Sequence, residues 1–378
     1  MKICHIITRL IQGGAQENTV YTALGQAKLG HEVTLLHGPE LNGESRFLAD
    51  LSGLKEETLP SLKRALSPCW DLKAYYDLKK YFSANAFDII HTHSSKAGIL
   101  GRLAAANAKT NAKIVHTIHG LAFDEFQSAL KNKLFIAAEK KAARVSDAII
   151  SVCDAMTEQA LAAGIGRKEL YHTVRSGSDL TAFQNAKNLR SDVRQKLGVA
   201  QDELLFVAVT RLFPKKGAPE IIRALPKNAK LLLIGGGPLQ SELQAFAEKE
   251  LKGQVIFYGQ AAPGDIPALI SAGDMLVHAS WREGLARVLV QALAEGIPVI
   301  SSRAGGAAEA VVEGVNGFLF PVGDERALKT LLERVAADHI LLSKLKEGAL
   351  KTDVSNYSIE AMVAGTMEVY KTLTQDRQ

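Results

Sequence analysis

Short runs of β-branched and apolar residues alternate with longer amphipathic stretches along most of the chain. This alternation is typical of strand–helix units that build parallel sheets. It predicts two groups of strands separated by a polar, turn-rich stretch, and therefore an α/β fold with two doubly wound domains. The predicted strands lie near 2–7, 31–36, 87–92, 113–118, 147–152 and 169–174, and then near 204–210, 229–234, 254–258, 274–278, 297–301 and 316–320.

A turn-rich stretch, 177–200, separates the two groups of strands, and the domain boundary is expected within 180–200. The chain has 378 residues, more than the roughly 250–300 at which a single core stops growing. We therefore expect one domain over 1–185 and a second over 186–356. The tail 357–378 carries apolar residues at near-helical spacing, so it should pack on a domain, but its periodicity does not indicate which one.

Composition favours a cytoplasmic protein. The N-terminal apolar run is too short for a secretory signal, and no segment approaches the roughly 18 apolar residues of a membrane-spanning helix. Cys4, Cys69 and Cys153 lie far apart, which argues against a disulfide framework and a zinc ribbon. The formal charge of +5 suits a phosphate-bearing ligand or an anionic membrane surface, and we expect no nucleic-acid partner.

Four glycine-containing loops follow predicted strands, where ligands bind in open α/β sheets. They are Gly13-Gly14, Gly235-Gly236-Gly237, the stretch 281–287 with Glu283, and Gly305-Gly306. Glycines let backbone N–H groups approach an anion at the start of a helix, although each loop alone is also compatible with a tight turn. The second loop lacks the third glycine and the acidic residue of a dinucleotide fingerprint, which disfavours NAD.

These loops belong to a longer, ordered set of motifs that spans nearly the whole chain. The set comprises residues 13–17, 114–120, 174–179, 211–217 and 280–291, followed by Pro298-Val299 and Gly305-Gly306. It resembles the retaining, nucleotide-sugar-dependent glycosyltransferases of family 4, whose GT-B fold has two facing Rossmann-like domains with a cleft between them. The resemblance implies transfer of a sugar from a nucleotide-diphosphate sugar, UDP before GDP on family frequency, to a lipid-linked, glycan or small-molecule acceptor. Such enzymes act in cell-envelope or glycoconjugate biosynthesis.

The same resemblance divides the work between the domains. It implies that 1–185 binds the acceptor, that 186–356 binds the donor, and that the C-terminal helix, 357–378, crosses back onto the first domain. No cofactor and no metal are implied, because the nucleotide sugar is itself a substrate and GT-B enzymes generally bind it without a metal.

Four residues are expected to be catalytic. Arg211 and Lys216 would hold the leaving diphosphate, because Arg can grip phosphate with two hydrogen bonds and Lys acts as a point charge. By resemblance, Glu283 would bind hydroxyls of the transferred sugar and His119 would lie at its far edge. The further donor-binding residues are expected to be Gly13, Gly14, Gly177, Gly236, Gly259, Gly284, Leu285, Ala286, Arg287, Val288 and Gln291.

One position departs from the family signature of Glu, seven residues, then Glu. Glu283 is followed eight positions later by Gln291, which can hydrogen-bond to ribose hydroxyls but carries no charge. The sequence also shows no enzyme nucleophile, so we expect same-face attack in which the departing phosphate takes the acceptor proton.

Two alternative functions remain open. A nucleotide-sugar epimerase of the same architecture would need acid/base carboxylates in the first domain, for which Asp124 and Glu125 are the candidates. A nucleotide-sugar binding protein without turnover is suggested by Gln291 alone. Consumption of donor with and without acceptor separates these functions.

Clustered histidines raise a zinc site as another possibility. His91 and His93 lie two apart on a predicted strand and point to one face, with His116 and His119 nearby in the sequence. No Cys or carboxylate stands at ligand spacing, so the histidines equally suit the lining of a cleft, and no metal is expected.

Basic and aromatic residues mix in 61–82, and a second basic amphipathic run covers 131–144. Both stretches are compatible with peripheral contact to the inner face of an anionic membrane, where a lipid-linked acceptor would be found. A helix packed by its aromatic side explains 61–82 equally well.

Overall fold

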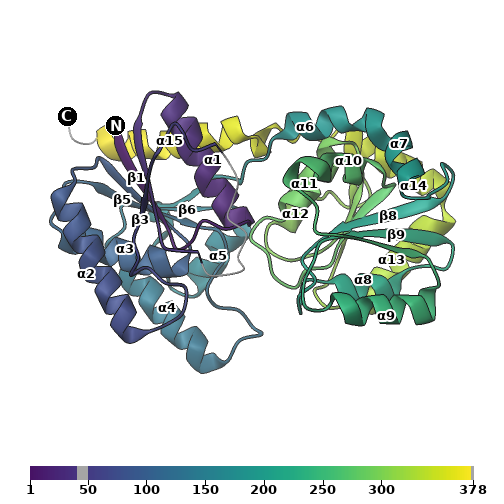
Figure 1. Cartoon of the computed structure of the whole chain (residues 1–378), viewed down its shortest axis with the longest axis horizontal. Coiled ribbons are helices and arrows are strands. Elements are labelled where there is room, and N and C mark those ends of the chain that lie inside the picture. Colours follow the sequence, from purple (N-terminus) through teal and green to yellow (C-terminus); the bar gives the residue numbers. More distant parts are fainter. Residues whose placement is uncertain (41–49, 376–378) are drawn as a thin grey trace. The chain divides into compact units, whose positions relative to one another are not determined.

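The computed structural model describes residues 1–40 and 50–375. The chain forms two compact units: unit 1 comprises Met1–Gly177 and the C-terminal segment from Ser358, and unit 2 comprises Ser178–Tyr357 (Figure 1). Residues 178–185, expected at the end of the first domain, lie instead in unit 2. The reason is helix α6 (Leu180–Asn185), which packs on helices of unit 2.

A parallel sheet in the order β3-β2-β1-β4-β5-β6-β7 forms the centre of unit 1. The edge strand β3 was not predicted, because its sequence Lys-Glu-Glu-Thr has no alternating apolar positions and is largely exposed. It is a strand because its backbone pairs with β2. The strands are β1 (Lys2–Ile7), β2 (Glu32–His37), β3 (Lys55–Thr58), β4 (Ile89–His93), β5 (Lys113–Ile118), β6 (Ala148–Ser151) and β7 (Tyr171–Thr173).

Helices cover both faces of this sheet. They are α1 (Gly14–Lys28), α2 (Pro68–Ala84), α3 (Ser95–Asn107), α4 (Ala129–Ala143), α5 (Asp154–Ala162), the 3₁₀ turn η1 (Lys168–Leu170) and the C-terminal helix α15 (Ile359–Gln375). Helices α2, α3 and α4 pack side by side, and α1 packs against α15 (Figure 1). The core places Met362, Met367 and Tyr370 of α15 with Ile3, Val115 and Ile150 of the sheet. The tertiary structure thus assigns the tail to unit 1.

Unit 2 has a second parallel sheet, in the order β10-β9-β8-β11-β12-β13. Its strands are β8 (Leu204–Val209), β9 (Ala229–Ile234), β10 (Val255–Gly259), β11 (Met275–His278), β12 (Val299–Ser302) and β13 (Gly317–Phe320). After α6 its helices are α7 (Arg190–Lys196), α8 (Ala218–Ala224), α9 (Gln240–Leu251), α10 (Ile266–Ser271), α11 (Arg287–Ala294), α12 (Ala307–Ala310), α13 (Glu325–Ala337) and α14 (His339–Leu350). Three 3₁₀ turns complete it: η2 (Ala186–Leu189), η3 (Pro263–Asp265) and η4 (Ser355–Tyr357).

The strand orders locate the expected binding edges. In unit 1 the order reverses between β1 and β4, and in unit 2 between β8 and β11. Ligands of open parallel sheets bind beyond the carboxyl ends of the strands at such a switch point, because the loops on its two sides leave in opposite directions. The loops after β1, β4, β8 and β11 are therefore the first places to look for chemistry.

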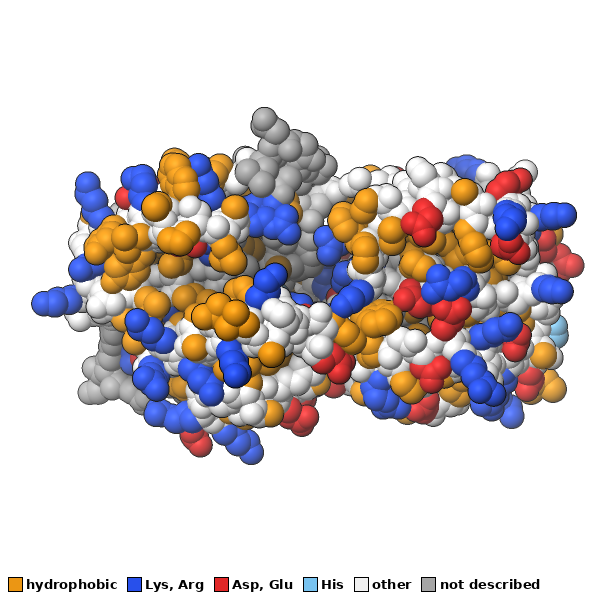
Figure 2. Space-filling model, turned by 90° about the horizontal axis from the view of Figure 1, so that it is seen from below, with side chains coloured by type: hydrophobic (Ala, Val, Ile, Leu, Met, Phe, Trp, Pro, Cys, Tyr) orange, Lys and Arg blue, Asp and Glu red, His pale blue; other side chains and the backbone are white. Residues whose placement is uncertain are grey.

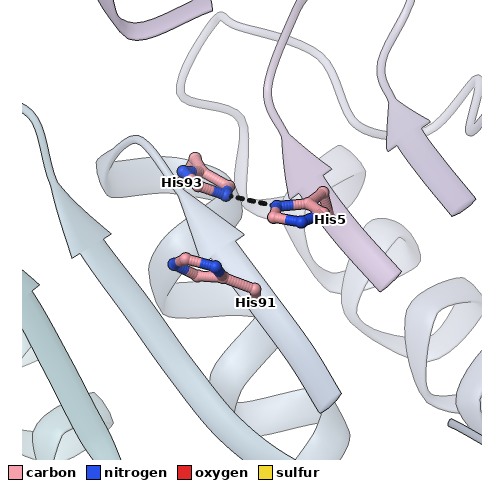
Figure 3. Close-up of side chains that lie close together, drawn as sticks. All are labelled: His5, His91 and His93. Carbon is pink, nitrogen blue, oxygen red and sulfur yellow. Dashed lines mark hydrogen bonds between the residues drawn. The ribbon is translucent and has the colours of Figure 1, made fainter. Parts of the chain in front are cut away.

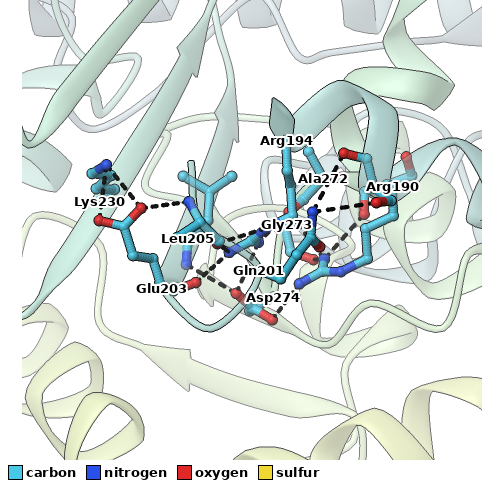
Figure 4. Close-up of polar contacts among 12 residues, drawn as sticks. Arg190, Arg194, Gln201, Glu203, Leu205, Lys230, Ala272, Gly273 and Asp274 are labelled. Atoms are coloured by element: carbon cyan, nitrogen blue, oxygen red, sulfur yellow. Dashed lines mark hydrogen bonds and ion pairs between the residues drawn. The ribbon is translucent and has the colours of Figure 1, made fainter. Parts of the chain in front are cut away.

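A charged network joins α7 to the end of the unit 2 sheet at which β11 begins, opposite the carboxyl ends of the strands (Figure 4). Arg190 donates to Asp274 Oδ1 at 2.8 Å, Lys346 donates to the same oxygen at 2.7 Å, and the buried Arg194 lies 3.4 Å from Oδ2. Burial alone would raise the pKa of Asp274, but the nearby Lys346 and its hydrogen bonds hold that pKa below its usual value. The network is structural, since it lies before β11 and the candidate site lies after it.

Glu295, which follows α11, is a buried carboxyl whose burial is not offset by hydrogen bonds from the described residues. Neither of its side-chain oxygens has a hydrogen-bond partner among the described residues, and burial raises its pKa to about 9. It therefore stays protonated in the folded protein at neutral pH, whereas an unfolded chain ionises it above about pH 4.3. The free energy of unfolding therefore falls as pH rises from the unfolded pKa of about 4.3 toward the folded pKa of about 9, because the unfolded state releases the proton more readily.

We expect Glu295→Gln to stabilise the protein at pH 8 by about 1–3 kcal/mol. The gain should be much smaller at pH 5, which is only slightly above the pKa of the unfolded chain, so that little of this stability has yet been lost. Urea unfolding at the two pH values measures the difference, and an equal gain at both would contradict the titration argument.

Candidate functional site

The loop after β8 approaches the loop after β11 at the switch point of unit 2. Gly217 adopts a left-handed conformation with φ 86°, and a Cβ there would lie 2.4 Å from the carbonyl carbon of Ala279. Only glycine therefore allows this approach without a shift of backbone. The Thr210 hydroxyl donates to the carbonyl of Lys216 at 2.9 Å and holds the loop from within. The result is that Lys216 faces the residues after β11.

Lys216 and Glu283 form the centre of the site. Lys216 Nζ donates to Glu283 Oε1 at 2.6 Å, and both side chains are about three-quarters buried, with 24% and 22% exposed. Burial would raise the pKa of Glu283, but His278 and Lys216 outweigh it and hold that pKa well below its usual range. The carboxylate is thus ionised at physiological pH and can accept hydrogen bonds from sugar hydroxyls.

Two neighbours of this pair were not predicted as site residues, although Ser280 begins the 280–291 motif. His278, the last residue of β11, is buried with Nε2 3.6 Å from Glu283 Oε1. Ser280 is buried beside them, with Oγ 3.4 Å from Lys216 Nζ. Their position at the end of a strand, just before an already suspected loop, was the available signal.

The start of α11 supplies backbone donors beside Glu283. Its N-cap residue, Ala286, has no side-chain hydrogen bond to the first turn, and the N–H groups at the start of a helix favour an anionic ligand. Gly305 has φ 54°, and a Cβ there would lie 2.3 Å from the carbonyl oxygens of Glu283 and Gly284. The fourth glycine loop therefore buttresses the third, which places Gly284, Leu285 and Ala286 in buried positions.

The glycine loop after β9 packs on the loop after β8. The Leu212 N–H donates to the carbonyl of Gly236 at 3.0 Å, and the Gly235 N–H donates to that of Gly259 at 2.8 Å. Gly236 and Gly259 are thereby joined to the loop that carries Arg211, which is exposed with its guanidinium carbon 5.5 Å from the ring centre of Phe213.

Gln291 and Gly177, both predicted to bind the donor, have contacts of their own. Gln291 is on the second turn of α11 and lies 3.5 Å from the Ser178 hydroxyl. Gly177 is in unit 1, where its N–H contacts Met362 Sδ at 3.1 Å and a Cβ would lie 2.7 Å from Ile359 Cα. The close backbone approach explains a glycine at 177 without any ligand.

Unit 1 has its own cavity at the carboxyl end of its sheet. It has a volume of about 250 Å³, and its lining includes Ala15, Ser94, Ser95, His116, His119 and Glu139. Gly13 and Gly14, at the start of α1, precede Ala15 of this lining. Sequence reasoning missed Ser94 and Ser95, although they follow a predicted strand directly.

Three histidines of β1 and β4 lie close together in unit 1 (Figure 3). The ring nitrogens of His5, His91 and His93 lie within 4.8 Å of one another, the one grouping among the described residues that matches a metal-ligand set. Every ring nitrogen of the three already has a hydrogen-bond partner in the protein. Burial lowers the pKa of each, that of His5 to about 4, so the rings are neutral. Because every ring nitrogen already has a partner in the protein, the set fits a hydrogen-bonded network better than a zinc site.

Two other features bear on the remaining hypotheses. Asp124 Oδ1 accepts from the backbone N–H of Phe126 at 2.8 Å, so the carboxylate considered for acid/base chemistry stabilises its own turn. No helix within residues 1–40 and 50–375 combines the length and the apolar character needed to cross a bilayer.

Comparison with known proteins gives consistent matches over both units. A family model described as "Glycosyltransferase Family 4" matches residues 12–181, and one described as "Glycosyl transferases group 1" matches 190–352. The UDP-Gal:alpha-D-GlcNAc-diphosphoundecaprenol alpha-1,3-galactosyltransferase of Escherichia coli is 30% identical over 300 residues, which cover 75% of each chain. The D-inositol 3-phosphate glycosyltransferase of Salinispora arenicola is 28% identical over 97% of this chain and 85% of its own. Among solved structures, Anabaena HepE in complex with UDP and glucose superposes with a TM-score of 0.81 at 24% identity, covering 98% of this chain and 99% of that one.

Proposed function

Because this chain belongs to glycosyltransferase family 4 and has the GT-B fold, we propose that it transfers a hexose from a UDP-sugar, with retention of configuration, to a lipid-linked or other glycan acceptor. The observation that carries the proposal is the Lys216–Glu283 pair at the switch point of unit 2. UDP is favoured over GDP because the names of the Escherichia coli relative and of the Anabaena complexes specify UDP or a UDP-sugar.

The residues around Lys216 match the charges that the reaction develops. Cleavage of the sugar–diphosphate bond places negative charge on the leaving phosphate, which pre-placed cations and N–H donors stabilise. Lys216, Arg211 and the first turn of α11 would supply them. On donor binding the Lys216–Glu283 hydrogen bond would break, and Glu283 would accept hydrogen bonds from hydroxyls of the sugar. Gln291 would hydrogen-bond to the ribose. Unit 1 would bind the acceptor, and His119 would contact the transferred sugar.

A thermal-shift panel tests the donor. A ligand that binds only the folded state stabilises it by RT ln(1 + [L]/Kd), about 2.7 kcal/mol at a hundredfold excess over Kd. We expect UDP and UDP-hexoses to raise the unfolding temperature, GDP and ADP to leave it unchanged, and Lys216→Ala to abolish the UDP effect. A response to GDP alone would contradict the assigned base.

We propose that donor binding and turnover need no divalent metal, since Lys216, Arg211 and helix N–H groups supply the positive charge. EDTA is expected to leave both the UDP shift and the transfer rate unchanged. A loss of activity restored by Mg²⁺ or Mn²⁺ would contradict this.

The acceptor side of the proposal includes peripheral contact with an anionic membrane. Leu72 and Tyr76 of α2 are each 57% exposed, and Leu130 and Leu134 of α4 are 70% and 64% exposed. The same helices also expose lysines (Lys73, Lys80, Lys131 and Lys133), and Figure 2 shows hydrophobic and basic groups interspersed on the surface of unit 1. Apolar side chains ringed by lysine suit insertion at the headgroup level.

Vesicle flotation tests this contact. We expect binding to vesicles rich in phosphatidylglycerol, weaker binding to phosphatidylcholine, and a severalfold loss on replacing Leu130 and Leu134 by glutamate. Leu29, after α1, is 60% exposed, and Leu29→Glu is the matched control. Equal losses in both variants would argue against a defined membrane face.

A further inference from the structure

A chain of hydrogen bonds leads from helix α1 through the buried histidines to His119. His5 Nε2 lies 2.7 Å from Gln26 Oε1, His5 Nδ1 lies 2.9 Å from His93 Nε2, and His93 Nδ1 lies 3.0 Å from His119 Nε2. The rings are also stacked, with centroids 5.1 Å apart for His5–His93 and 5.2 Å for His93–His119. The buried amide thus reaches a residue of the unit 1 cavity through two intervening imidazoles.

The donor and acceptor of each hydrogen bond in this chain follow from its buried end, Gln26. An amide oxygen can only accept, so His5 must carry its proton on Nε2. Burial lowers the pKa of His5 and His93, with mutual repulsion adding to the effect at His93, so each ring carries a single N–H. His5 Nδ1 is then an acceptor, which requires the N–H of His93 on Nε2. His93 Nδ1 is in turn an acceptor, which requires the N–H of His119 on Nε2.

A second branch holds the same rings from the side. His91 Nδ1 lies 2.5 Å from the Tyr370 hydroxyl of α15, and His91 Nε2 lies 2.7 Å from the Thr117 hydroxyl. The rings of His91 and His93 lie 4.2 Å apart. Thr117 stands two residues before His119, so this branch fixes the strand end from which His119 leaves. With both nitrogens bonded, His91 has little freedom to rotate.

We propose that Gln26, His5 and His93 are positioning residues that fix His119 as the Nε2–H tautomer, so that Nδ1 is the atom with which His119 accepts a hydrogen bond from a hydroxyl of the substrate. A donor hydroxyl of a sugar requires such an acceptor, whereas the opposite tautomer would present an N–H. The kinetic consequence rests on the proposed function of His119, but the tautomer itself does not.

Nuclear magnetic resonance of the ¹⁵N-histidine-labelled wild-type protein tests the tautomer directly. Long-range ¹H–¹⁵N spectra separate a protonated from an unprotonated ring nitrogen, and single His→Gln variants assign the signals. We expect His5, His93 and His119 each to carry the proton on Nε2 at pH 7.5. A proton on Nδ1 of His119, or a charged His5 or His93, would overturn the proposal.

Gln26→Leu removes the amide that bonds to His5 and replaces it with an apolar side chain of similar size. We expect a mixture of His119 tautomers and a fall in kcat of about tenfold or more, with the UDP-induced thermal shift unchanged. Thr22→Val is the control: Thr22 is buried on the same helix, and its hydroxyl donates to the Asn18 carbonyl of that helix, so the substitution should leave tautomer and kcat unchanged. Equal losses in both variants would reduce Gln26 to a structural role and overturn the proposal.

The two hypotheses fail separately. If the histidines carry the expected protons but the protein turns over no nucleotide sugar, the proposed function is contradicted and the proposed histidine hydrogen-bond chain is supported. Normal turnover with the His119 proton on Nδ1 would do the reverse.

Discussion

Replacing Lys216 by alanine is expected to lower the transfer rate by about 10²–10³-fold. Lys216 is the partly buried cation within reach of Glu283, and in the proposed mechanism it meets the charge that develops on the leaving diphosphate. Its loss also removes one of the groups that lower the pKa of Glu283. The pKa of Glu283 should therefore rise, and the acid limb of the pH–rate profile should move to higher pH.

Rates with a saturating UDP-hexose, measured from pH 4 to 8, check both effects. The neighbouring Lys215→Gln variant is the control: Lys215 lies 5.8 Å from the ring centre of Trp281 and is exposed. We expect it to retain activity within about threefold, the range of an ordinary surface charge change. If Lys216→Ala kept wild-type rates, the leaving-group role would have to be reassigned to Arg211 and the α11 N–H groups.

Acidification from pH 7.5 to 5 is expected to destabilise unit 1 strongly. Burial lowers the pKa of His5, His91, His93 and His116, so these rings stay neutral when folded but take up protons near pH 6.5 when unfolded. Stability is therefore complete above pH 6.5 and falls as pH decreases toward the folded-state values. Each ring that remains neutral at pH 5 costs about 2 kcal/mol relative to pH 7.5.

Two tryptophans allow each unit to be followed separately. Trp70 lies in unit 1 and Trp281 in unit 2, so Trp281→Phe reports unfolding of unit 1 and Trp70→Phe that of unit 2. We expect the urea midpoint of the Trp70 signal to fall much more between pH 7.5 and 5 than that of the Trp281 signal. Parallel shifts would argue against the buried histidines as the cause.

The sequence-based predictions were strongest where function depends on short, local motifs. The family resemblance is confirmed by matches over both halves of the chain. The glycine loops were found because glycine is required where backbones approach closely, as at Gly235 and Gly305. The roles of individual site residues remain predictions that the experiments above test.

The misses share a different cause. His278 was passed over because a histidine at a strand end has no distinctive pattern, and its proximity to Glu283 depends on the course of the following loop. From the sequence, His91, His93, His116 and His119 suggested a metal or a cleft lining. The structure adds His5, whose partner is Gln26, a helix residue with no recognisable motif.

The sequence by itself determined the two-domain α/β organisation, the strands with apolar runs, the glycine loops and the family, because periodicity and short motifs are properties of neighbouring residues. Only the tertiary structure decided which core residues α15 contacts, the strand β3 and the order of the histidine chain. Each depends on pairing between distant segments: Tyr370 meets His91 across 279 positions, and β3 is a strand through its partner β2. Such contacts are selected by packing and register of the whole sheet, and no local pattern records them.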